Sequence, residues 1–319
     1  MSLFGTLIAQ DATTPGGGSP PYPLIGTVPN VASLGSSGFA SVADAVSHYD
    51  TAWGGATCFR TFSSGAIGTW SSGQVGQVKS VSNASVWHSF KTWDPTAITA
   101  WINGKPNDGV PALLTFHHEP ENDGWDASQI LTWKQRVSDL VGLRDATGRT
   151  DVQVGPILMS SWTLNSQSGR DFWGDWYVGP AISGYTPGGF PGYAEQDFYG
   201  WDPYNQGWKN STPLYADPDN ILNGTNKSIL EVHQVTGLPL GIGEYGSPQI
   251  SSDTDDSGRA QHITDYLNYC INNFAEVKAM CYWSDYLGGA FDPRINGSPT
   301  ALAAIAPFAA ASRAEWGIS

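Results

Sequence analysis

Residues 112–158 hold ALLTFH (112–117), SQILTWKQRVSDLVGLRDA (128–146) and VQVGPIL (152–158), in that order. The first and third segments are short apolar runs. The middle segment places Trp133, Val137 and Leu140, together with Ile130 and Val141, at helical spacing, and Ser128 is a candidate cap at its start. A strand, a helix of crossover length and a second strand predict a parallel βαβ unit.

The same alternation extends along the rest of the chain. Further helical patterns cover 221–236 and 258–273, each ahead of an apolar run. The other candidate strands are 23–28, 57–61, 85–90, 196–201, 240–244 and 279–283. Eight strands with intervening helices predict an α/β fold, a (β/α)8 TIM barrel, and 319 residues fit one such domain. We expect a Gly/Pro-rich leader over residues 1–23 and a single catalytic barrel over residues 24–319.

Charge and composition limit the possible partners. Fifteen basic and 29 acidic residues give a formal charge of -14, which repels phosphate backbones and anionic membranes, although an acidic surface also simply aids solubility. No run approaches the ~18 apolar residues of a membrane span. We therefore expect neither nucleic acid nor a membrane as partner, and we expect a monomer.

The N-terminal residues lack the basic region and apolar core of a secretory signal. If the natural chain begins at Met1, an extracellular or particle-associated location would require another route of export. Cys58, Cys270 and Cys281 are too few and too widely spaced for a disulfide framework or a zinc site. We expect buried thiols, with one bridge and one free thiol as the alternative.

Two glutamates follow candidate strands. Glu119 stands in TFHHEPENDGW (115–125), and Glu244 stands in PLGIGEYG (239–246). Barrel chemistry gathers at the C-terminal ends of the strands. Glycoside cleavage needs one carboxyl to protonate the leaving oxygen and another at the anomeric carbon, ~5–5.5 Å apart in retaining enzymes. Either glutamate alone would be read as a solvated loop residue, but the pair favours glycoside hydrolysis.

The sequence around these glutamates resembles clan A glycoside hydrolases, and within them family 26, best known for β-mannanases. The residues that carry the resemblance are His118-Glu119, Gly124-Trp125, DFYGWDPYN (197–205), LPLGIGEYG (238–246) and MCYWSD (280–285). They occur in the family's order and extend thinly over roughly residues 24–290. The segment departs from the mannanase pattern at Glu119-Pro120-Glu121 and lacks the Arg-Pro that commonly precedes the His-Glu pair.

The resemblance implies a retaining, endo-acting hydrolase of a polysaccharide or oligosaccharide, a β-mannanase or a related glycanase. Glu119 would be the general acid/base and Glu244 the nucleophile, with no cofactor and no metal. His118 would bind the sugar beside the scissile bond, Tyr204 would hold Glu244 by a hydrogen bond, and Trp283 would be a platform under the reacting sugar. Barrel packing explains Trp283 equally well.

Further candidates for substrate binding lie near predicted strand ends. They are Arg60, His88, Trp125, Trp162 and Asp202. Arg60 would orient the carboxylates or contact sugar hydroxyls, with a structural ion pair as an equal alternative. A lone histidine such as His88 is more often a satisfied core residue. An aromatic-rich segment between the fifth and sixth strands is consistent with a wall of a sugar cleft or with a local hydrophobic cluster; its aromatic residues are Trp173, Trp176, Tyr177, Tyr185, Phe190 and Tyr193.

Parts of the sequence are also compatible with two other functions. Metal-dependent hydrolysis would need ligands that converge, yet His117 and His118 are adjacent on a strand and should point to opposite faces. The sequence also contains no H-E-x-x-H helix. A non-catalytic carbohydrate-binding barrel of a virion or surface assembly would keep the aromatic residues without needing both glutamates. The presence of both favours the enzyme.

Overall fold

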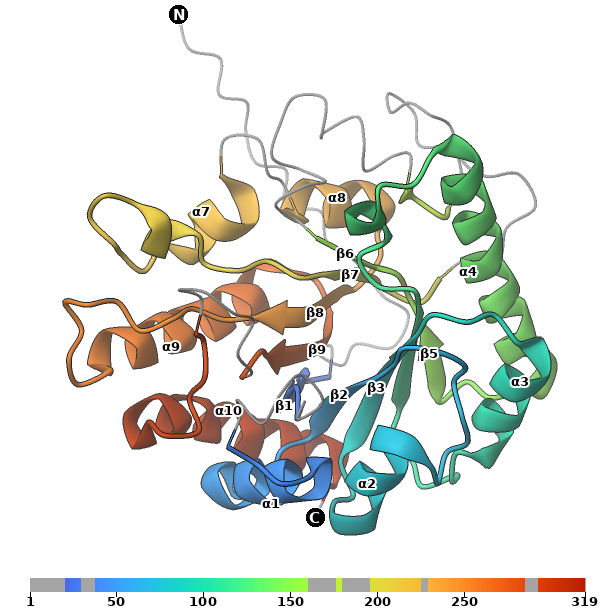
Figure 1. Cartoon of the computed structure of the whole chain (residues 1–319), viewed down its shortest axis with the longest axis horizontal. Helices are drawn as coiled ribbons and strands as arrows, with labels where there is room; N and C mark the ends of the chain where they lie inside the picture. Colours follow the sequence, from blue (N-terminus) through green and yellow to red (C-terminus); the bar gives the residue numbers. More distant parts are fainter. Residues whose placement is uncertain are drawn as a thin grey trace, which may run out of the picture.

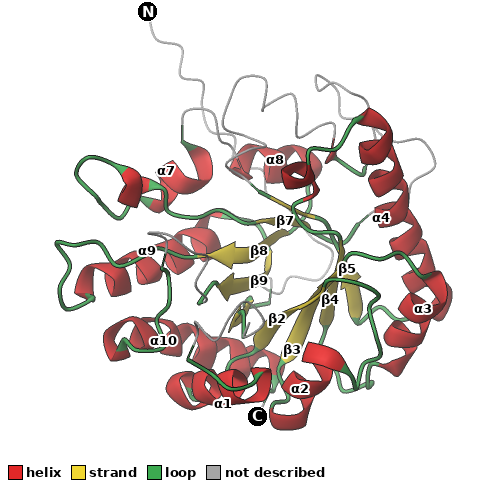
Figure 2. Ribbon diagram, viewed as in Figure 1, coloured by secondary structure: helices red, strands yellow, loops and turns green. Residues whose placement is uncertain are grey.

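The computed structural model describes residues 21–29, 38–159, 176–179, 196–224, 229–284 and 292–318. Parallel strands surround a central axis, and the helices form an outer ring around them (Figures 1 and 2). The strands join in one sheet in the order β5-β4-β3-β2-β1-β9-β8-β7-β6. The predicted (β/α)8 TIM-barrel fold is confirmed.

The strands match the predicted apolar runs closely. Their bounds are β1 Leu24–Thr27, β2 Cys58–Ser63, β3 Ser85–Phe90, β4 Ala112–Phe116, β5 Val152–Val154, β6 Ile157–Leu158, β7 Tyr199–Trp201, β8 Leu240–Tyr245 and β9 Val277–Tyr282. Most of these residues are buried, because helices cover one face of the sheet and the barrel interior covers the other.

The fifth predicted strand is interrupted at Gly155-Pro156, which divides it into β5 and β6. β5 pairs with β4, and β6 pairs with β7. The Gly155 amide donates to the carbonyl of Leu114 (3.2 Å), and the Pro156 carbonyl accepts from the Gly200 amide (2.9 Å). Proline has no amide hydrogen to continue a ladder, which accounts for the break. One continuous segment thus bonds to both neighbouring strands, and the eight predicted strands close into a barrel.

The described helices cover the outside of the sheet. Their bounds are α1 Val42–Trp53, α2 Gly73–Val81, α3 Pro95–Gly104, α4 Ala127–Thr147, α7 Pro218–Asn223, α8 Ile229–Thr236, α9 Ser257–Asn273 and α10 Pro299–Trp316. The helix predicted over 221–236 is therefore two short helices, α7 and α8. The helix predicted over 258–273 is α9.

The cap predicted for α4 was wrong by two residues. Asp126, not Ser128, is the N-cap: its side chain accepts from the amides of Ser128 and Gln129, and the Gln129 side chain bonds back to the Asp126 amide. This reciprocal pair satisfies amides that the first turn leaves open, and a carboxylate does so more strongly than a hydroxyl. Ser128 lies inside the helix.

The barrel interior holds its own apolar cluster, separate from the larger one between sheet and helices. It comprises Leu24, Cys58, Trp87, Leu113, Ile157, Phe198, Ala279, Cys281 and Ile318. The three cysteines are free and buried, as the sequence predicted, and the Sγ atoms of Cys58 and Cys281 lie 3.9 Å apart in this cluster. Among the described helices, none has the length and apolar character to cross a membrane.

Gly26 of β1 tests how tightly the interior is packed. A Cβ atom there would overlap the carbonyl of Cys58 on the paired strand, so Gly26→Ala should lower the free energy of unfolding by about 3 kcal/mol or more. Gly142→Ala is the matched control: the site is exposed, within α4, with nothing in contact range, and the change should raise stability by about 0.5–1 kcal/mol. Urea denaturation measures both, and equal effects would contradict the packing described.

Candidate active site

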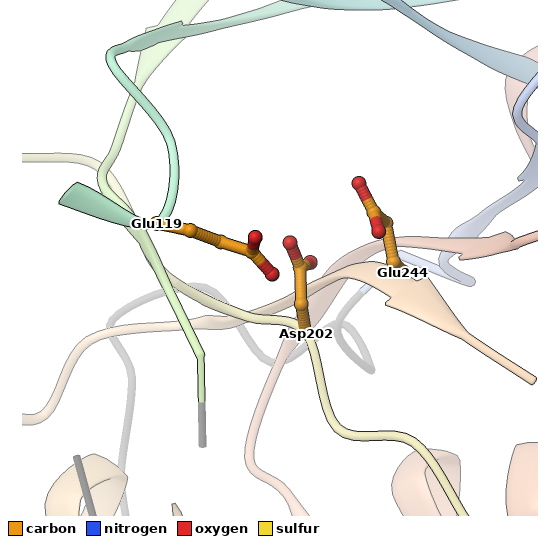
Figure 3. Close-up of side chains that lie close together, drawn as sticks. All are labelled: Glu119, Asp202 and Glu244. Carbon is orange, nitrogen blue, oxygen red and sulfur yellow. The ribbon is translucent and has the colours of Figure 1, made fainter. Parts of the chain in front are cut away.

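Three carboxylates from three strand ends meet above the barrel interior. Glu119 follows β4, Asp202 follows β7, and Glu244 lies in β8. One oxygen of each lies within 4.8 Å of the others. Figure 3 shows the three side chains converging, with Asp202 drawn between the two glutamates. The structure thus brings together two predicted catalytic residues and one predicted substrate-binding residue.

Arg60 of β2 supplies the positive charge of this cluster. Its Nη1 lies 2.9 Å from Asp202 Oδ1 and 3.0 Å from Glu244 Oε1. The Arg60 side chain is fully buried, and its guanidinium also lies 4.9 Å from the Phe62 ring centroid. A buried guanidinium is stable only when anions compensate it. Arg60 therefore fixes two of the carboxylates, rather than offering itself to solvent.

The space for this ion pair depends on Gly243. A Cβ atom at Gly243 would overlap Arg60 Nη1 and lie 2.6 Å from Asp202 Oδ1. Any larger residue would separate Arg60 from its anions. The glycine-rich sequence before Glu244 is thus explained by the ion pair beside it.

Glu244 is held from two sides in a buried setting. The Tyr204 hydroxyl donates to Glu244 Oε2, while Arg60 contacts Oε1. Burial raises the pKa of Glu244 to about 7, aided by the nearby charge of Glu119 and opposed by Arg60 and by the Tyr204 hydrogen bond. The fixed orientation and the two bonds to its ionised form suit a nucleophile.

Glu119 sits on an unusual backbone. Glu119 and His117 both have positive φ (50° and 49°), and the Glu119 amide donates to the Ile157 carbonyl (2.8 Å). The 3-10 turn η1, Pro120–Asp123, follows directly, and Asn122 Nδ2 donates to Glu119 Oε2 (3.0 Å). Left-handed conformations are unfavourable for residues other than glycine and cluster at functional sites. Here they aim the carboxyl group of Glu119 at Asp202 and Glu244.

The pKa of Glu119 is also raised. Burial is the main cause, and it outweighs the charge of Arg60 and the hydrogen bonds that favour the carboxylate. Unlike Glu244, Glu119 makes no direct contact with Arg60 among the described ion pairs. A raised pKa favours the protonated form of Glu119, and that is the form that a general acid requires.

Aromatic rings line one side of the cluster. The Phe62 ring lies 5.1 Å from His118 and 6.2 Å from Trp283, between centroids. Burial and the charge of Arg60 hold the pKa of His118 well below its usual value, so its ring is neutral. Neutral rings beside carboxylates form a surface that suits the apolar faces and hydroxyls of a sugar.

His88 and Trp125 do not join the cluster. His88 is buried on the outer face of β3, stacked on Trp101 at 5.9 Å, with Thr61 and Ser63 hydroxyls at its two nitrogens. Alternation along the strand explains this, since the neighbouring Trp87 points into the barrel. The substrate-binding role expected for His88 is therefore corrected to packing. Trp125 contacts the His117 ring at 4.4 Å.

Parts of the predicted site lie beyond the described residues. Trp162 lies outside them, as do four aromatic residues of the segment between the fifth and sixth strands, Trp173, Tyr185, Phe190 and Tyr193. Trp176 and Tyr177 are buried; Trp176 packs on Trp133 at 5.5 Å. These two form part of the hydrophobic cluster rather than an exposed wall.

Three residues of the cluster were missed in the sequence: Phe62, Asn122 and Gly243. Phe62 stands two residues after Arg60, on the same face of one strand, and that spacing was a usable signal. Asn122 lies in the turn that follows Glu119. The contact of Gly243 with Arg60 joins β8 to β2, which are not neighbours in the sheet, so no local pattern indicates it.

The cluster does not fit a divalent metal ion. Three carboxylates could ligate one, but Arg60 already lies within 3.0 Å of two of them and would repel a second cation. A hollow of about 570 Å³ occurs elsewhere, lined by Asp50, Lys79 and Arg313 among others. It lies at the N-terminal ends of β2 and β3, where barrel residues serve stability, so we assign no chemistry to it.

Comparisons with known proteins agree on the fold. No protein-family model matches the sequence, and no curated protein matches it. The chain is similar to an exo-β-1,4-mannosidase from Opitutaceae bacterium strain TAV5 (11% identity, TM-score 0.58), covering 94% of this chain and 60% of that one. It is similar to a glucosidase from Croceicoccus marinus (15%, TM-score 0.56), covering 91% and 69%. A third is the GH26 domain of an endo-β-mannanase/endo-β-glucanase from Prevotella bryantii (13%, TM-score 0.50; 89% and 88%).

These similarities support the barrel predicted from the sequence. At such low identity they show the fold, and structures with this fold include a family 26 domain. The chain spans only 60% of the mannosidase. Activity depends on the residues of the cluster, which the fold alone does not specify.

The raised pKa of Glu244 predicts how stability varies with pH. A carboxyl group whose pKa is raised on folding stabilises the protein fully below the unfolded-state value, near pH 4.3, and loses that contribution as pH rises through about 7. Glu244→Gln cannot ionise, so its stability relative to wild type should increase from pH 5 to pH 8. The increase should be on the order of 3 kcal/mol at most.

Thermal unfolding at several pH values measures this effect. Glu276→Gln is the matched control, because Glu276 pairs with Lys278 outside the cluster. A stability difference for Glu244→Gln that stays constant between pH 5 and pH 8 would contradict the environment described for Glu244.

Proposed function

We propose that this chain is a retaining glycoside hydrolase in which Glu119 is the general acid/base and Glu244 the nucleophile. The observation that carries the proposal is the close approach of their oxygens, within 4.8 Å, from opposite sides of the barrel. Retaining enzymes place the two carboxyl groups ~5–5.5 Å apart, whereas inverting enzymes leave ~6.5–9.5 Å for a water molecule. The separation supports retention.

The reaction would proceed in two displacements. In the first, Glu244 attacks the anomeric carbon as the bond to the leaving oxygen breaks, and Glu119 gives its proton to that oxygen. In the second, Glu119 takes a proton from water as the water oxygen displaces Glu244. Tyr204 and Arg60 hold Glu244 in place for the attack, as the resemblance to family 26 implies for Tyr204.

The charges of Glu119 and Glu244 support the change of Glu119 from acid in the first displacement to base in the second. The negative charge of Glu119 raises the pKa of Glu244, and the charge of Glu244 must act on Glu119 in the same direction, because repulsion between like charges is mutual. When Glu244 becomes an ester its charge disappears, and the pKa of Glu119 falls. Glu119 is then a carboxylate ready to accept a proton from water, as the second displacement requires.

The substrate we propose is a polysaccharide, cleaved internally, with β-mannans and related glycans as the first candidates. Support comes from the His118-Glu119 pair and from the mannanase and mannosidase among the similar structures. His118 and Trp283 would contact the sugar. A polymer substrate suits a monomeric protein that acts outside the cell or on a particle surface.

Glu121, two residues after Glu119, is a second candidate for the acid by sequence position alone. It is buried instead, and its Oε1 accepts a hydrogen bond from the Met159 amide. This contact ties the turn after β4 to the segment after β6. Glu121 therefore positions the loop that carries Glu119, which leaves Glu119 as the acid.

A screen of mannans, glucans and bacterial cell-wall glycans tests the function. We expect wild-type protein to cleave at least one polymer. Glu119→Ala and Glu244→Ala should each lose about 10³-fold or more in kcat/KM, because the first removes the proton donor and the second removes the nucleophile. Proton NMR of the first-formed product should show retained anomeric configuration.

Glu276→Ala serves as control and should leave hydrolysis unchanged, since Glu276 lies outside the cluster. An inverted product would refute the retaining mechanism. Binding of a glycan without cleavage by wild-type protein would favour the non-catalytic carbohydrate-binding barrel instead.

Gly243→Ala tests the role of Arg60 in holding Glu244. The added methyl group should push Arg60 from its anions and lower kcat about 100-fold, the order expected when a catalytic group moves by about 1 Å. Gly142→Ala, on the exposed face of α4, should leave kcat unchanged. Equal kcat values for the two variants would show that the bridge is dispensable.

A further inference from the structure

Asp202 has one bonded oxygen and one that lacks a donor. Its Oδ1 accepts from Arg60 at 2.9 Å. Its Oδ2 is buried and has no hydrogen-bond donor among the described residues. The Asp202 side chain is fully shielded from solvent, so water cannot easily satisfy that oxygen. A buried carboxylate oxygen without a donor is unfavourable, and such atoms need an explanation.

Glu119 presents the complementary group. Its Oε2 accepts from Asn122 Nδ2 at 3.0 Å, which marks Oε2 as the oxygen without a proton. Its Oε1 is buried and also lacks a donor among the described residues. The closest oxygens of Glu119 and Asp202 lie within 4.8 Å, and Figure 3 shows the two carboxyl groups turned toward each other. Two buried carboxyl oxygens thus face each other, and an ionised carboxyl oxygen can only accept a hydrogen bond.

We infer that Glu119 and Asp202 share one proton, held between Glu119 Oε1 and Asp202 Oδ2, and that Asp202 is the positioning residue for the catalytic acid. A single proton satisfies both oxygens at once: a carboxyl O–H donates and a carboxylate accepts. This replaces the substrate-binding role expected for Asp202. The inference gains its catalytic meaning from the proposed function, on which it rests in that respect.

The charges around the pair are consistent with one proton. Arg60 faces Asp202 from β2, and Glu244 lies beside both in β8. Lys91, which follows β3, pairs with Asp123 at 3.9 Å, and its charge acts weakly on Glu119. His118 is neutral, and the Tyr204 hydroxyl is committed to Glu244. Arg60 is the one cation in direct contact with the cluster in the part of the chain that the structure describes. Three ionised carboxylates beside it would leave two uncompensated charges within 4.8 Å. One proton on the Glu119–Asp202 pair relieves that repulsion.

The shared proton has a role in catalysis. Asp202, anchored by Arg60, keeps the proton of Glu119 on the oxygen that points into the cluster. On binding substrate, this proton passes to the leaving oxygen as the glycosidic bond breaks, and the proton taken from water in the second displacement restores it. No other reactant is required. Asp202 acts throughout by way of Glu119.

Carbon NMR of the full chain with ¹³C-labelled Asp and Glu carboxyl groups tests the inference without a substrate. In wild-type protein the carboxyl signals of Glu119 and Asp202 should respond over the same pH interval, because a pair that shares a proton titrates as a unit. Glu119→Gln and Asp202→Asn assign the two signals. An Asp202 signal that stays unchanged over the interval in which Glu119 titrates would overturn the inference.

Asp202→Asn supplies the second reading. The pKa of Glu119 should fall by at least one pH unit, because the anion that retains its proton is gone, and the alkaline limb of kcat/KM should move to lower pH by the same amount. Asp197→Asn is the matched control: it breaks an Arg144–Asp197 pair of 2.6 Å just before the same strand and should leave both unchanged. An unchanged Glu119 pKa in folded Asp202→Asn also overturns the inference.

The two proposals can fail separately. Joint titration in a chain that cleaves no glycan would refute the proposed function and leave the shared proton intact. The opposite result is hydrolysis that depends on Glu119 and Glu244 while Glu119 and Asp202 titrate independently. It would support the proposed function and refute the shared proton. Where Asp202→Asn fails to fold, Glu119→Gln still assigns the Glu119 signal. An aspartate signal that titrates together with Glu119 in wild-type protein, and loses that titration in Glu119→Gln, then supports the shared proton; the absence of any such signal overturns it.

Discussion

The rest of the site depends on the ion pairs that the buried guanidinium of Arg60 forms with Asp202 and Glu244. β2, which carries Arg60, is separated from β8 and β7 in the sheet by β1 and β9. The contacts of Arg60 with Asp202 and Glu244 therefore cross the barrel interior instead of following neighbouring strands. A guanidinium in this position is stable only beside anions, and the anions keep their orientation only beside it. The strand ends are thereby fixed relative to one another.

The layer beneath the cluster makes these charges effective. Trp87, Phe198, Cys58 and Cys281 belong to the apolar cluster that fills the interior, and the Arg60 guanidinium lies 5.8 Å from the Trp87 ring centroid. Gly241 permits this packing, because a Cβ atom there would lie 2.8 Å from Trp87. The two glycines of β8 therefore leave space for different groups: Gly241 for the apolar layer, and Gly243 for the ion pair of Arg60. The apolar layer lies under the cluster, and Glu119 is partly exposed to solvent whereas Asp202 and Glu244 are buried. The carboxyl groups therefore have different surroundings, which allows one cluster to hold both an acid and a nucleophile.

Much of the fold followed from local patterns, because parallel strands covered on both faces appear as short apolar runs. The same patterns located Glu119 and Glu244 at strand ends. The orientation of His88 was also accessible, since alternation from Trp87 places it outside the barrel. The sequence shows Gly155-Pro156 inside the fifth predicted strand. It does not show that these residues divide the strand into β5, which pairs with β4, and β6, which pairs with β7. The association of Arg60 with Asp202 spans 142 residues and the barrel interior, so only the assembled structure reveals it.

The numbers of charges and protons in the cluster explain why three carboxylates accompany one arginine. Before reaction, an ionised Glu244, one negative charge shared by Glu119 and Asp202, and Arg60 give a net charge of about -1, on the proton assignment inferred above. In the glycosyl-enzyme, Glu244 is a neutral ester, the shared proton has left with the leaving group, and the net charge is the same. The buried arginine thus faces a constant charge while the negative charge moves from the nucleophile to the acid. A site with only two carboxylates beside Arg60 would be neutral in both states, and its acid would lack the neighbouring anion that keeps it protonated.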